Sequence, residues 1–141
     1  MQLRPRQADF VKRCLAALAK EGNTLGIAPT GAGKTVMLSA VLDGRKGRSL
    51  VLQHRIELVN QNKRTYLAFV PGAPTAEYTA DEKTWSDGVT FGMVQTLCRD
   101  KNLATLPKLD TIVIDECHHV AADSYQEILT KAREVNPKLR V

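Results

Sequence analysis

Ala28-Pro29-Thr30-Gly31-Ala32-Gly33-Lys34-Thr35 is the stretch of the chain that decides the fold. It follows an apolar, β-prone segment at residues 24–27 and precedes a segment at 36–42 that is competent to form a helix. A strand, a loop of small residues and a helix in this order form a phosphate-binding loop, because successive backbone N–H groups and the positive end of the helix dipole face one anion. The sequence therefore predicts a nucleotide site where a strand passes into a helix.

The residue types in this loop suit different parts of a bound triphosphate. Gly31 and Gly33 accept positive φ and let the backbone approach the phosphates closely. Lys34 adds a point charge for the β and γ phosphates, and the hydroxyl of Thr35 suits Mg²⁺. Because Ala28 stands where the usual pattern has Gly, the alternative is a glycine-rich turn with a solvated lysine. We expect the nucleotide to be bound by Thr30, Gly31, Ala32, Gly33, Lys34 and Thr35.

Length and composition limit the class of protein. The chain has 141 residues, of which 43% are hydrophobic, and this suits a single domain with one core. Its three cysteines, Cys14, Cys98 and Cys117, lie far apart without a C-x-x-C pair, so they indicate neither a disulfide framework nor a zinc site. No apolar run approaches the ~18 residues of a membrane span, and no secretory signal is recognisable. We expect a soluble, cytoplasmic protein with no membrane partner.

The charge balance is compatible with a polyanionic partner. Twenty Lys and Arg against fifteen Asp and Glu give a formal net charge of +5, whereas aromatic residues make up only 5%. A domain with so few stacking platforms would bind nucleic acid mainly through its phosphates. The basic turn at residues 43–48 is interpreted as a solvated loop.

Strand and helix patterns alternate along the chain. The run Thr111-Ile112-Val113-Ile114 is typical of a parallel strand covered on both faces. The alternation predicts an α/β fold, a doubly wound parallel sheet with helices on both faces and a ligand crevice at the carboxyl ends of the strands. Helices are expected at 3–20, 36–42, 56–66, 95–101 and 123–135, and strands at 24–27, 49–52, 75–79, 89–94 and 111–114.

Two carboxylates follow the strand at 111–114. Hydrolysis of a nucleoside triphosphate needs one carboxylate to hold Mg²⁺ and a second group to orient or deprotonate the attacking water. Asp115 is placed for the first task and Glu116 for the second. The adjacent His118 and His119 do not have metal-ligand spacing, so a γ-phosphate sensor or a link to a partner domain is favoured over zinc.

The motif Asp115-Glu116-Cys117-His118-His119, together with the loop at 28–35, resembles the first RecA-like domain of superfamily 2 helicases of the DEAD/DEAH-box-like type, in a DECH variant. Leu3-Arg4-Pro5-Arg6-Gln7 resembles the N-terminal element of that family, which implies that Gln7 reads adenine, with Arg4 in the same nucleotide site. Residues 51–61 resemble motif Ia, and residues 91–97 resemble the G-x-x-Q-T/S-L segment. The resemblance implies that Arg55, Gln95 and Thr96 line the path of a nucleic-acid backbone. The nearest subgroup is the RadD-like DNA-repair helicases and their phage relatives.

The resemblance implies an ATP-dependent helicase or translocase that uses ATP and Mg²⁺ and acts on nucleic acid, with DNA favoured over RNA. Arg6 departs from the tyrosine of the family. Three alternatives stay open, namely a duplex translocase of a restriction or remodelling system, a stand-alone P-loop NTPase or small-molecule kinase, and a non-catalytic, nucleotide-gated binding module.

The end of the chain bears on the domain organisation. In the resembling family a strand leading to an S/T-A-T motif follows the helix after Asp-Glu, and a second RecA-like domain follows that motif. Residues 138–141 correspond to the start of this strand. We therefore expect residues 1–141 to be one monomeric N-terminal RecA-like domain, truncated before motif III, with the second RecA-like domain absent.

We predict that the isolated 141-residue chain binds ATP–Mg²⁺ weakly and hydrolyses it barely or not at all. The physical reason is that arginine fingers from a second domain contribute about 10³ to 10⁵ in rate in related hydrolases. Steady-state release of phosphate, measured with and without DNA, checks this, and turnover at rates typical of helicases would refute it.

Overall fold

The computed structural model describes residues 5–21, 32–45, 47–114 and 123–141. Helices and strands alternate along much of these residues, but the strands at 75–78 and 89–93 follow each other with no helix between them, against the prediction of alternation throughout. The elements are α1 (Pro5–Glu21), α2 (Ala32–Gly44), β1 (Ser49–Gln53), α3 (Ile56–Phe69), β2 (Thr75–Tyr78), β3 (Val89–Met93), α4 (Val94–Leu97), α5 (Asp100–Leu103), β4 (Thr111–Ile114) and α6 (Asp123–Val135).

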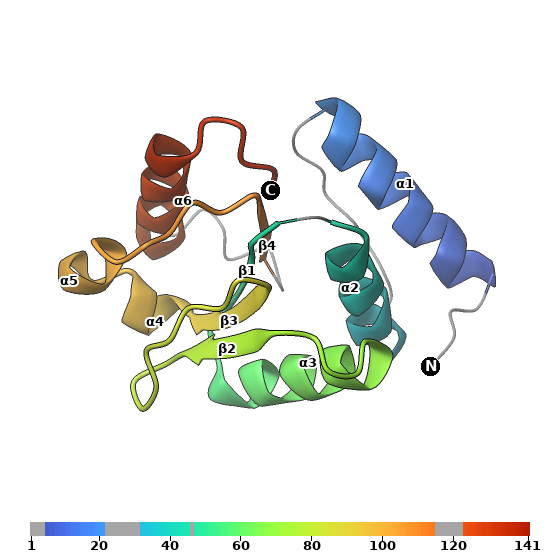
Figure 1. Ribbon diagram of the computed structural model, residues 1–141, viewed down its shortest axis with the longest axis horizontal. Helices are drawn as coiled ribbons and strands as arrows, with labels where there is room; N and C mark the ends of the chain where they lie inside the picture. The colour runs from blue at the N-terminus through green and yellow to red at the C-terminus, as the bar shows by residue number, and fades with distance from the viewer. Residues whose placement is uncertain (1–4, 22–31, 46, 115–122) are drawn as a thin grey trace.

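The described strands form one parallel sheet in the order β2-β3-β1-β4 (Figure 1). β1 is central, since Ser49 aligns with Val89 of β3 on one side and with Thr111 of β4 on the other. The prediction of a parallel α/β sheet is therefore confirmed. The strand expected at 24–27 lies outside the described residues.

Helices cover both faces of the sheet. Leu50 and Leu52 of β1 and Ile112 of β4 belong to a buried cluster with Ile128 and Leu129 of α6. A second cluster, on the opposite face because side chains alternate along a strand, joins the sheet to α2 and α3. Its buried members are Leu42, Val51, Val59, Tyr66, Val89 and Phe91.

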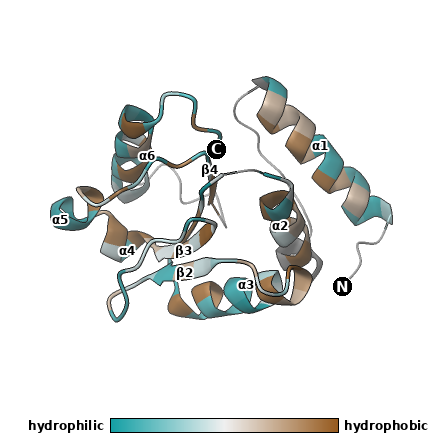
Figure 2. Cartoon of the chain, in the orientation of Figure 1, coloured by the Kyte–Doolittle hydropathy of each residue, from teal (hydrophilic) through white to brown (hydrophobic). Residues whose placement is uncertain are grey.

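Helix α1 forms an additional layer outside α2 (Figure 1). Val11 and Leu18 of α1 are buried against Met37, Ala40 and Val41 of α2. Because α2 is covered from two sides, it is mainly hydrophobic, whereas hydrophilic and hydrophobic residues intermix along α1, α3 and α6 (Figure 2). No helix in the described part of the chain is long and apolar enough to cross a membrane.

The helix expected at 95–101 is divided into two single-turn helices, α4 and α5. Arg99 between them is extended, with φ of −72° and ψ of 139°. The break lets the side chain of Asn102 fold back, so that its Nδ2 donates to the carbonyl of Thr96 at 2.7 Å. In a continuous helix that carbonyl would accept from the backbone N–H four residues later. A side-chain contact over six residues has therefore replaced a backbone contact of a continuous helix.

The polar segment at residues 79–88 is held against the edge strand β2. Thr79 N–H donates to the carbonyl of Glu82 at 2.6 Å, and Thr84 N–H donates to the carbonyl of Glu77 at 3.2 Å. The ring of Trp85 packs on Tyr78 with 5.0 Å between ring centroids. The segment thereby covers part of an edge that would otherwise expose backbone hydrogen-bonding groups.

The amino-terminal end of β4 is joined to two other segments. Arg45 Nε, just after α2, donates to Thr111 Oγ1 at 3.0 Å, and Arg48 N–H donates to Asp110 Oδ2 at the same distance. Arg140 forms a single parallel bridge with Thr111, where the sequence predicted the start of a further strand. The turn at 43–48, interpreted above as solvated, is therefore partly engaged in tertiary contacts.

Replacing Gly47 by Ala should lower the free energy of unfolding by about 2–3 kcal/mol, which combines left-handed strain with disturbance of one hydrogen bond. Gly47 has φ of +89°, and a Cβ there would collide with Asp110 Oδ2. Gly72→Ala is the matched control, because Gly72 has φ of +78° and no atom within 4 Å of its added Cβ. Urea unfolding followed by circular dichroism measures both, and equal losses would contradict the role given to Asp110.

Candidate functional site

The start of α2 and the end of β4 lie at the same edge of the sheet. The end of α2 is tied to the start of β4 by the Arg45–Thr111 hydrogen bond. Leu38 and Leu42 of α2 pack in the cluster that contains Val51 and Val113, so the helix lies along the sheet. Because its 13 residues extend for about 20 Å, its first turn reaches the carboxyl edge, where β4 ends at Ile114.

This arrangement suits the predicted nucleotide site. Ala32, Gly33, Lys34 and Thr35 form the first turn of α2, which contains no acidic residue that would neutralise the positive end of the helix dipole. Asp115 follows β4 directly in the sequence. The hydroxyl of Thr35 and the carboxylate of Asp115 are oxygen donors of the kind that Mg²⁺ prefers.

Several predicted site residues lie outside the described residues, so their contacts remain predictions. These are Arg4, Thr30, Gly31, Asp115 and Glu116, and the same holds for Cys117, His118 and His119. Within the described ranges, no group of three or more His, Cys, Asp or Glu side chains could hold a metal ion.

Gln7 lies near the beginning of α1 and is half-buried. Helices α1 and α2 run in the same direction, because Leu15 of α1 packs on Gly44 at the end of α2 and both helices begin at the lower side of Figure 1. Gln7 precedes Leu15 by two helical turns, so it lies toward the beginning of α2. This is the side of the molecule on which the predicted nucleotide site lies.

The three predicted nucleic-acid residues come together at the ends of β1 and β3. Arg55 is the exposed residue that precedes α3, and Gln95 and Thr96 belong to α4. The two strands end side by side, since Gln53 aligns with Met93. Gln95 Nε2 donates to the carbonyl of His54 at 2.9 Å, which links the two segments directly.

Two buried amide side chains near this edge were not singled out from the sequence. Gln53 is fully buried and donates through Nε2 to the carbonyl of Leu58 at 3.1 Å, while no donor among the described residues reaches its Oε1. A glutamine that ends the apolar run 50–52 is a signal that could have drawn attention to it. Asn102 is 5% exposed, and no pattern in the sequence distinguishes it from a solvated residue.

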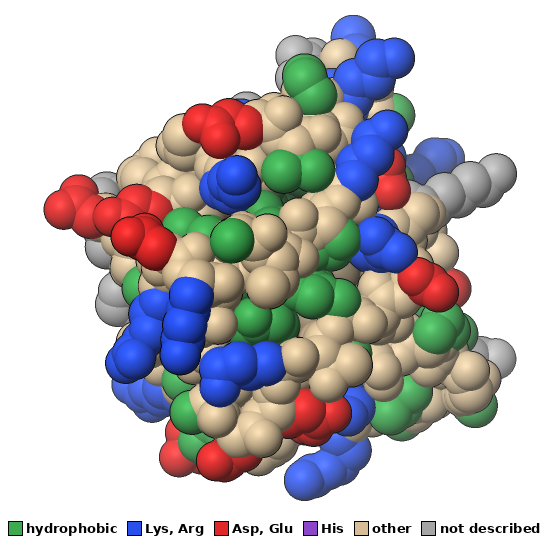
Figure 3. All heavy atoms as spheres, turned by 60° about the vertical axis from the view of Figure 1, so that its left-hand side comes forward, with side chains coloured by type: hydrophobic (Ala, Val, Ile, Leu, Met, Phe, Trp, Pro, Cys, Tyr) green, Lys and Arg blue, Asp and Glu red, His purple; other side chains and the backbone are tan. Residues whose placement is uncertain are grey.

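The charge on the surface is mixed. Figure 3, which brings the α5 side of the molecule forward, shows Lys and Arg in several separate groups, with Asp and Glu side chains between them. Arg48, for example, makes an exposed 2.7 Å ion pair with Asp87. Within the described part of the chain, this face therefore carries no large patch of a single charge.

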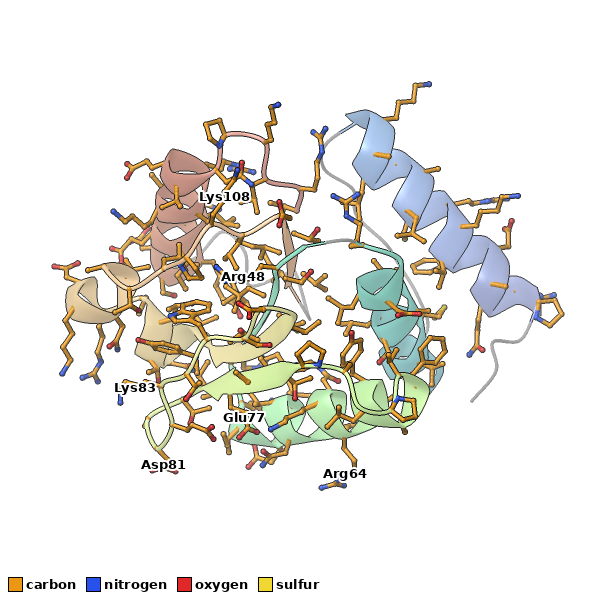
Figure 4. The ribbon with its side chains drawn as sticks, in the orientation of Figure 1. Arg48, Arg64, Glu77, Asp81, Lys83 and Lys108 are labelled. Carbon is orange, nitrogen blue, oxygen red and sulfur yellow. The ribbon has the colours of Figure 1, made fainter. Side chains whose placement is uncertain are left out.

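Other features of the described chain lie away from this edge. A hollow of about 300 Å³ between α3 and β2 is lined by Asn60, Lys63, Arg64, Leu67 and Glu77. Figure 4 shows Arg64 pointing away from α3 on the outer side.

Burial raises the pKa of the Cys14 thiol. Burial is also the larger cause that raises the pKa of Tyr66, and the nearby Asp43 carboxylate is the smaller cause. Both groups therefore stay protonated at neutral pH, as packing residues do.

Comparison with known proteins adds independent information. A family model described as "Type III restriction enzyme, res subunit" (ResIII) matches residues 1–140. The putative ATP-dependent helicase IRC3 of Saccharomyces cerevisiae is 31% identical over 156 aligned residues, which cover 99% of this chain and 22% of IRC3. The putative DNA 3'-5' helicase Rad25 of Halobacterium salinarum is 35% identical over 127 aligned residues, which cover 87% of this chain and 20% of Rad25. The chain thus spans roughly a fifth of these relatives.

Solved structures show the same fold. The SWI2/SNF2 ATPase core of Sulfolobus solfataricus, solved in complex with dsDNA, superposes with a TM-score of 0.68 at 21% identity, over 99% of this chain and 30% of that one. The UvsW helicase of bacteriophage T4 superposes with a TM-score of 0.63 at 18% identity, over 96% of this chain and 50% of the UvsW chain. Both superpositions span nearly the whole of this chain, so the parallel sheet described above has the RecA-like arrangement of these cores.

Proposed function

This chain belongs to the ResIII family of superfamily 2 helicase domains, and we propose that it is the ATP-binding lobe of a motor that moves along DNA. The observation that carries the proposal is the convergence at one edge of the sheet. The first turn of α2, the end of β4 and the segments that contain Arg55 and Gln95 all lie there. A nucleotide and a nucleic acid bound at this edge would share the strands that end there.

For the nucleotide, we assign the phosphates to Lys34 and the backbone N–H groups at the start of α2. Thr35 and Asp115 would hold Mg²⁺, which when bound neutralises charge on the phosphates. Glu116 would orient and accept a proton from the attacking water, because it follows Asp115 by one residue and both come directly after β4. Gln7, with Arg4 beside it in the sequence, would read the base. The direction of α1 supports this assignment.

For the nucleic acid, we assign phosphate contacts to Arg55, Gln95 and Thr96. The exposed Arg55 and Gln95 and the half-buried Thr96, after the ends of two adjacent strands, suit a backbone that passes across the edge of the sheet. DNA is proposed over RNA because the relatives include a putative DNA 3'-5' helicase and a DNA 3'-5' translocase, XPB2 of Sulfurisphaera tokodaii, 30% identical over 128 residues.

The proposed coupling between the two ligands runs through β1. This strand lies between β4, which precedes the carboxylates, and β3, which precedes α4. A change in the position of β4 on nucleotide hydrolysis would reach the DNA contacts across two parallel ladders. We propose that turnover also needs a second RecA-like lobe, as the sequence resemblance implies, so that the ATP-bound and hydrolysed states grip the strand differently.

A second candidate is translocation along duplex DNA without strand separation. The similarity to XPB2, a DNA 3'-5' translocase, favours it. In the complete protein, displacement of a triplex-forming strand without release of either duplex strand would support this candidate over a helicase. Affinity for DNA that does not depend on salt, or no affinity, would support a stand-alone NTPase instead.

Lys34→Ala should abolish ATP binding, because it removes the charge proposed to face the phosphates.

Glu116→Gln should preserve binding of ATP and DNA in the complete protein and abolish turnover, since an amide cannot accept the proton of the attacking water. Filter binding paired with phosphate release distinguishes the two effects. Unchanged turnover in the Glu116 variant would remove that residue from its role.

Arg55→Gln should weaken DNA binding by about threefold to tenfold and reduce the slope of log affinity against log salt by about one, because one phosphate contact is lost. Arg64→Gln is the matched control, since Arg64 is also exposed but lies within α3, at the border of the hollow beside β2 and not at the end of a strand. Fluorescence anisotropy of a labelled oligonucleotide, titrated at several salt concentrations, measures both. Equal effects of the two changes would mean that Arg55 contributes only to the general charge.

A further inference from the structure

The hydroxyl of Thr105 joins parts of the protein that are separate in sequence. Trp85 Nε1 donates to it at 3.1 Å, Tyr78 Oη lies 3.2 Å away, and the hydroxyl lies 2.7 Å from the carbonyl of Asn102, to which it donates. An indole N–H can only donate, and a threonine has one hydroxyl hydrogen, so the Tyr78 hydroxyl is the donor in its own contact. Thr105 then donates one hydrogen bond and accepts two, which uses its full capacity.

Asn102 extends this network to α4. Its side chain is 5% exposed, and Nδ2 donates to the carbonyl of Thr96 at 2.7 Å. A continuous series of contacts therefore leads from the segment at 79–88, through α5, to the residues assigned above to the DNA backbone. We call Trp85, Thr105 and Asn102 the Thr105 network.

Helix α4 depends on such contacts for its position. It is a single turn of four residues, and a helix of this length is not stable by itself because nucleation is costly. Its residues Val94 and Leu97 belong to the buried core cluster and are 2% and 0% exposed. Gln95 Nε2 holds it to the carbonyl of His54 on one side, and Asn102 holds the carbonyl of Thr96 on the other.

We propose that Asn102 is a positioning residue for the DNA contacts of α4, and that Thr105 connects the position of α4 to Trp85. The inference rests on the proposed function, because Gln95 and Thr96 are assigned there to the DNA backbone. A turn that is held before binding loses less conformational freedom when DNA arrives. Without Asn102, the turn has to be ordered by the DNA itself, and the affinity falls.

The test compares two buried asparagines that make the same kind of hydrogen bond. Asn102→Ala removes the 2.7 Å contact from Nδ2 to the carbonyl of Thr96. Asn136 directly follows α6 and is 4% exposed, and Asn136→Ala removes a 2.7 Å contact from Nδ2 to the carbonyl of Leu109. It also removes a 3.1 Å contact that Oδ1 accepts from Lys138 N–H. The control therefore loses at least as much hydrogen bonding at the same burial, but has no connection to α4.

Binding of a short fluorescein-labelled oligodeoxynucleotide is measured by anisotropy for both variants and the wild type, together with the urea midpoint of each. We expect Asn102→Ala to lower the affinity about threefold to tenfold, the usual range for one lost hydrogen bond. Asn136→Ala should change it by less than about twofold, because distant sites act independently. Thr105→Val is an isosteric change at an exposed position, and it should lower the affinity by about twofold, less than Asn102→Ala does.

Trp85 provides a spectroscopic reading of the same network, since it is the only tryptophan of the chain. Addition of unlabelled oligonucleotide should change its emission in the wild type and in Asn136→Ala, but not in Asn102→Ala. A loss of stability alone would not produce this difference, because the control loses a comparable hydrogen bond.

The possible results separate the inference from the proposed function. If the wild type does not bind the oligonucleotide, the proposed function and the inference both fail. If the wild type binds and Asn102→Ala weakens binding no more than Asn136→Ala does, only the inference fails. If Asn102→Ala does not fold, Thr105→Val decides, and its unchanged affinity and emission response would overturn the inference.

Discussion

The parallel pairing of β1 with both β3 and β4 is the constraint on which the rest of this structure depends. Every residue of β1 is at most 1% exposed, because the strand is paired along both edges and covered on both faces. Neighbouring parallel strands end at the same edge, so the pairing of the strands places the segments that follow them side by side. The chemistry proposed for this domain follows from that topology.

The two edges of the sheet have different physical roles. At the amino edge, polar groups are used to hold the fold, as in the contacts of Arg45 with Thr111 and of Arg48 with Asp110 and Asp87. At the carboxyl edge, Arg55 and Gln95 remain exposed. The net positive charge of the chain is therefore a poor guide to where a polyanion would bind, because part of it is paired at the edge opposite the candidate site.

The short helices after β3 show how far the candidate site depends on distant contacts. Neither α4 nor α5 is longer than four residues, so their geometry is determined by buried side chains and by the amides and hydroxyls that link them. The segment at 79–88, which the sequence presents only as a polar excursion, takes part in this arrangement through Trp85 and Thr105. A surface loop thereby influences a turn that is assigned to DNA.

The sequence by itself determined the class of the fold, the order of its elements and the family. Long periodic segments and a phosphate-loop motif are local signals, so the helix at 123–135 and the strand at 111–114 were predicted with the boundaries that the structure has. That Lys34 and Asp115 face one magnesium-bound triphosphate remains a prediction. Only the tertiary structure decided that the helix expected at 95–101 is broken, that Gln53 is buried, and that Asn102 and Thr105 support Thr96. The burial of Gln53 depends on the strands and helices that surround β1, and the other features depend on side chains that fold back on residues three to six positions away. No periodicity of the sequence encodes either.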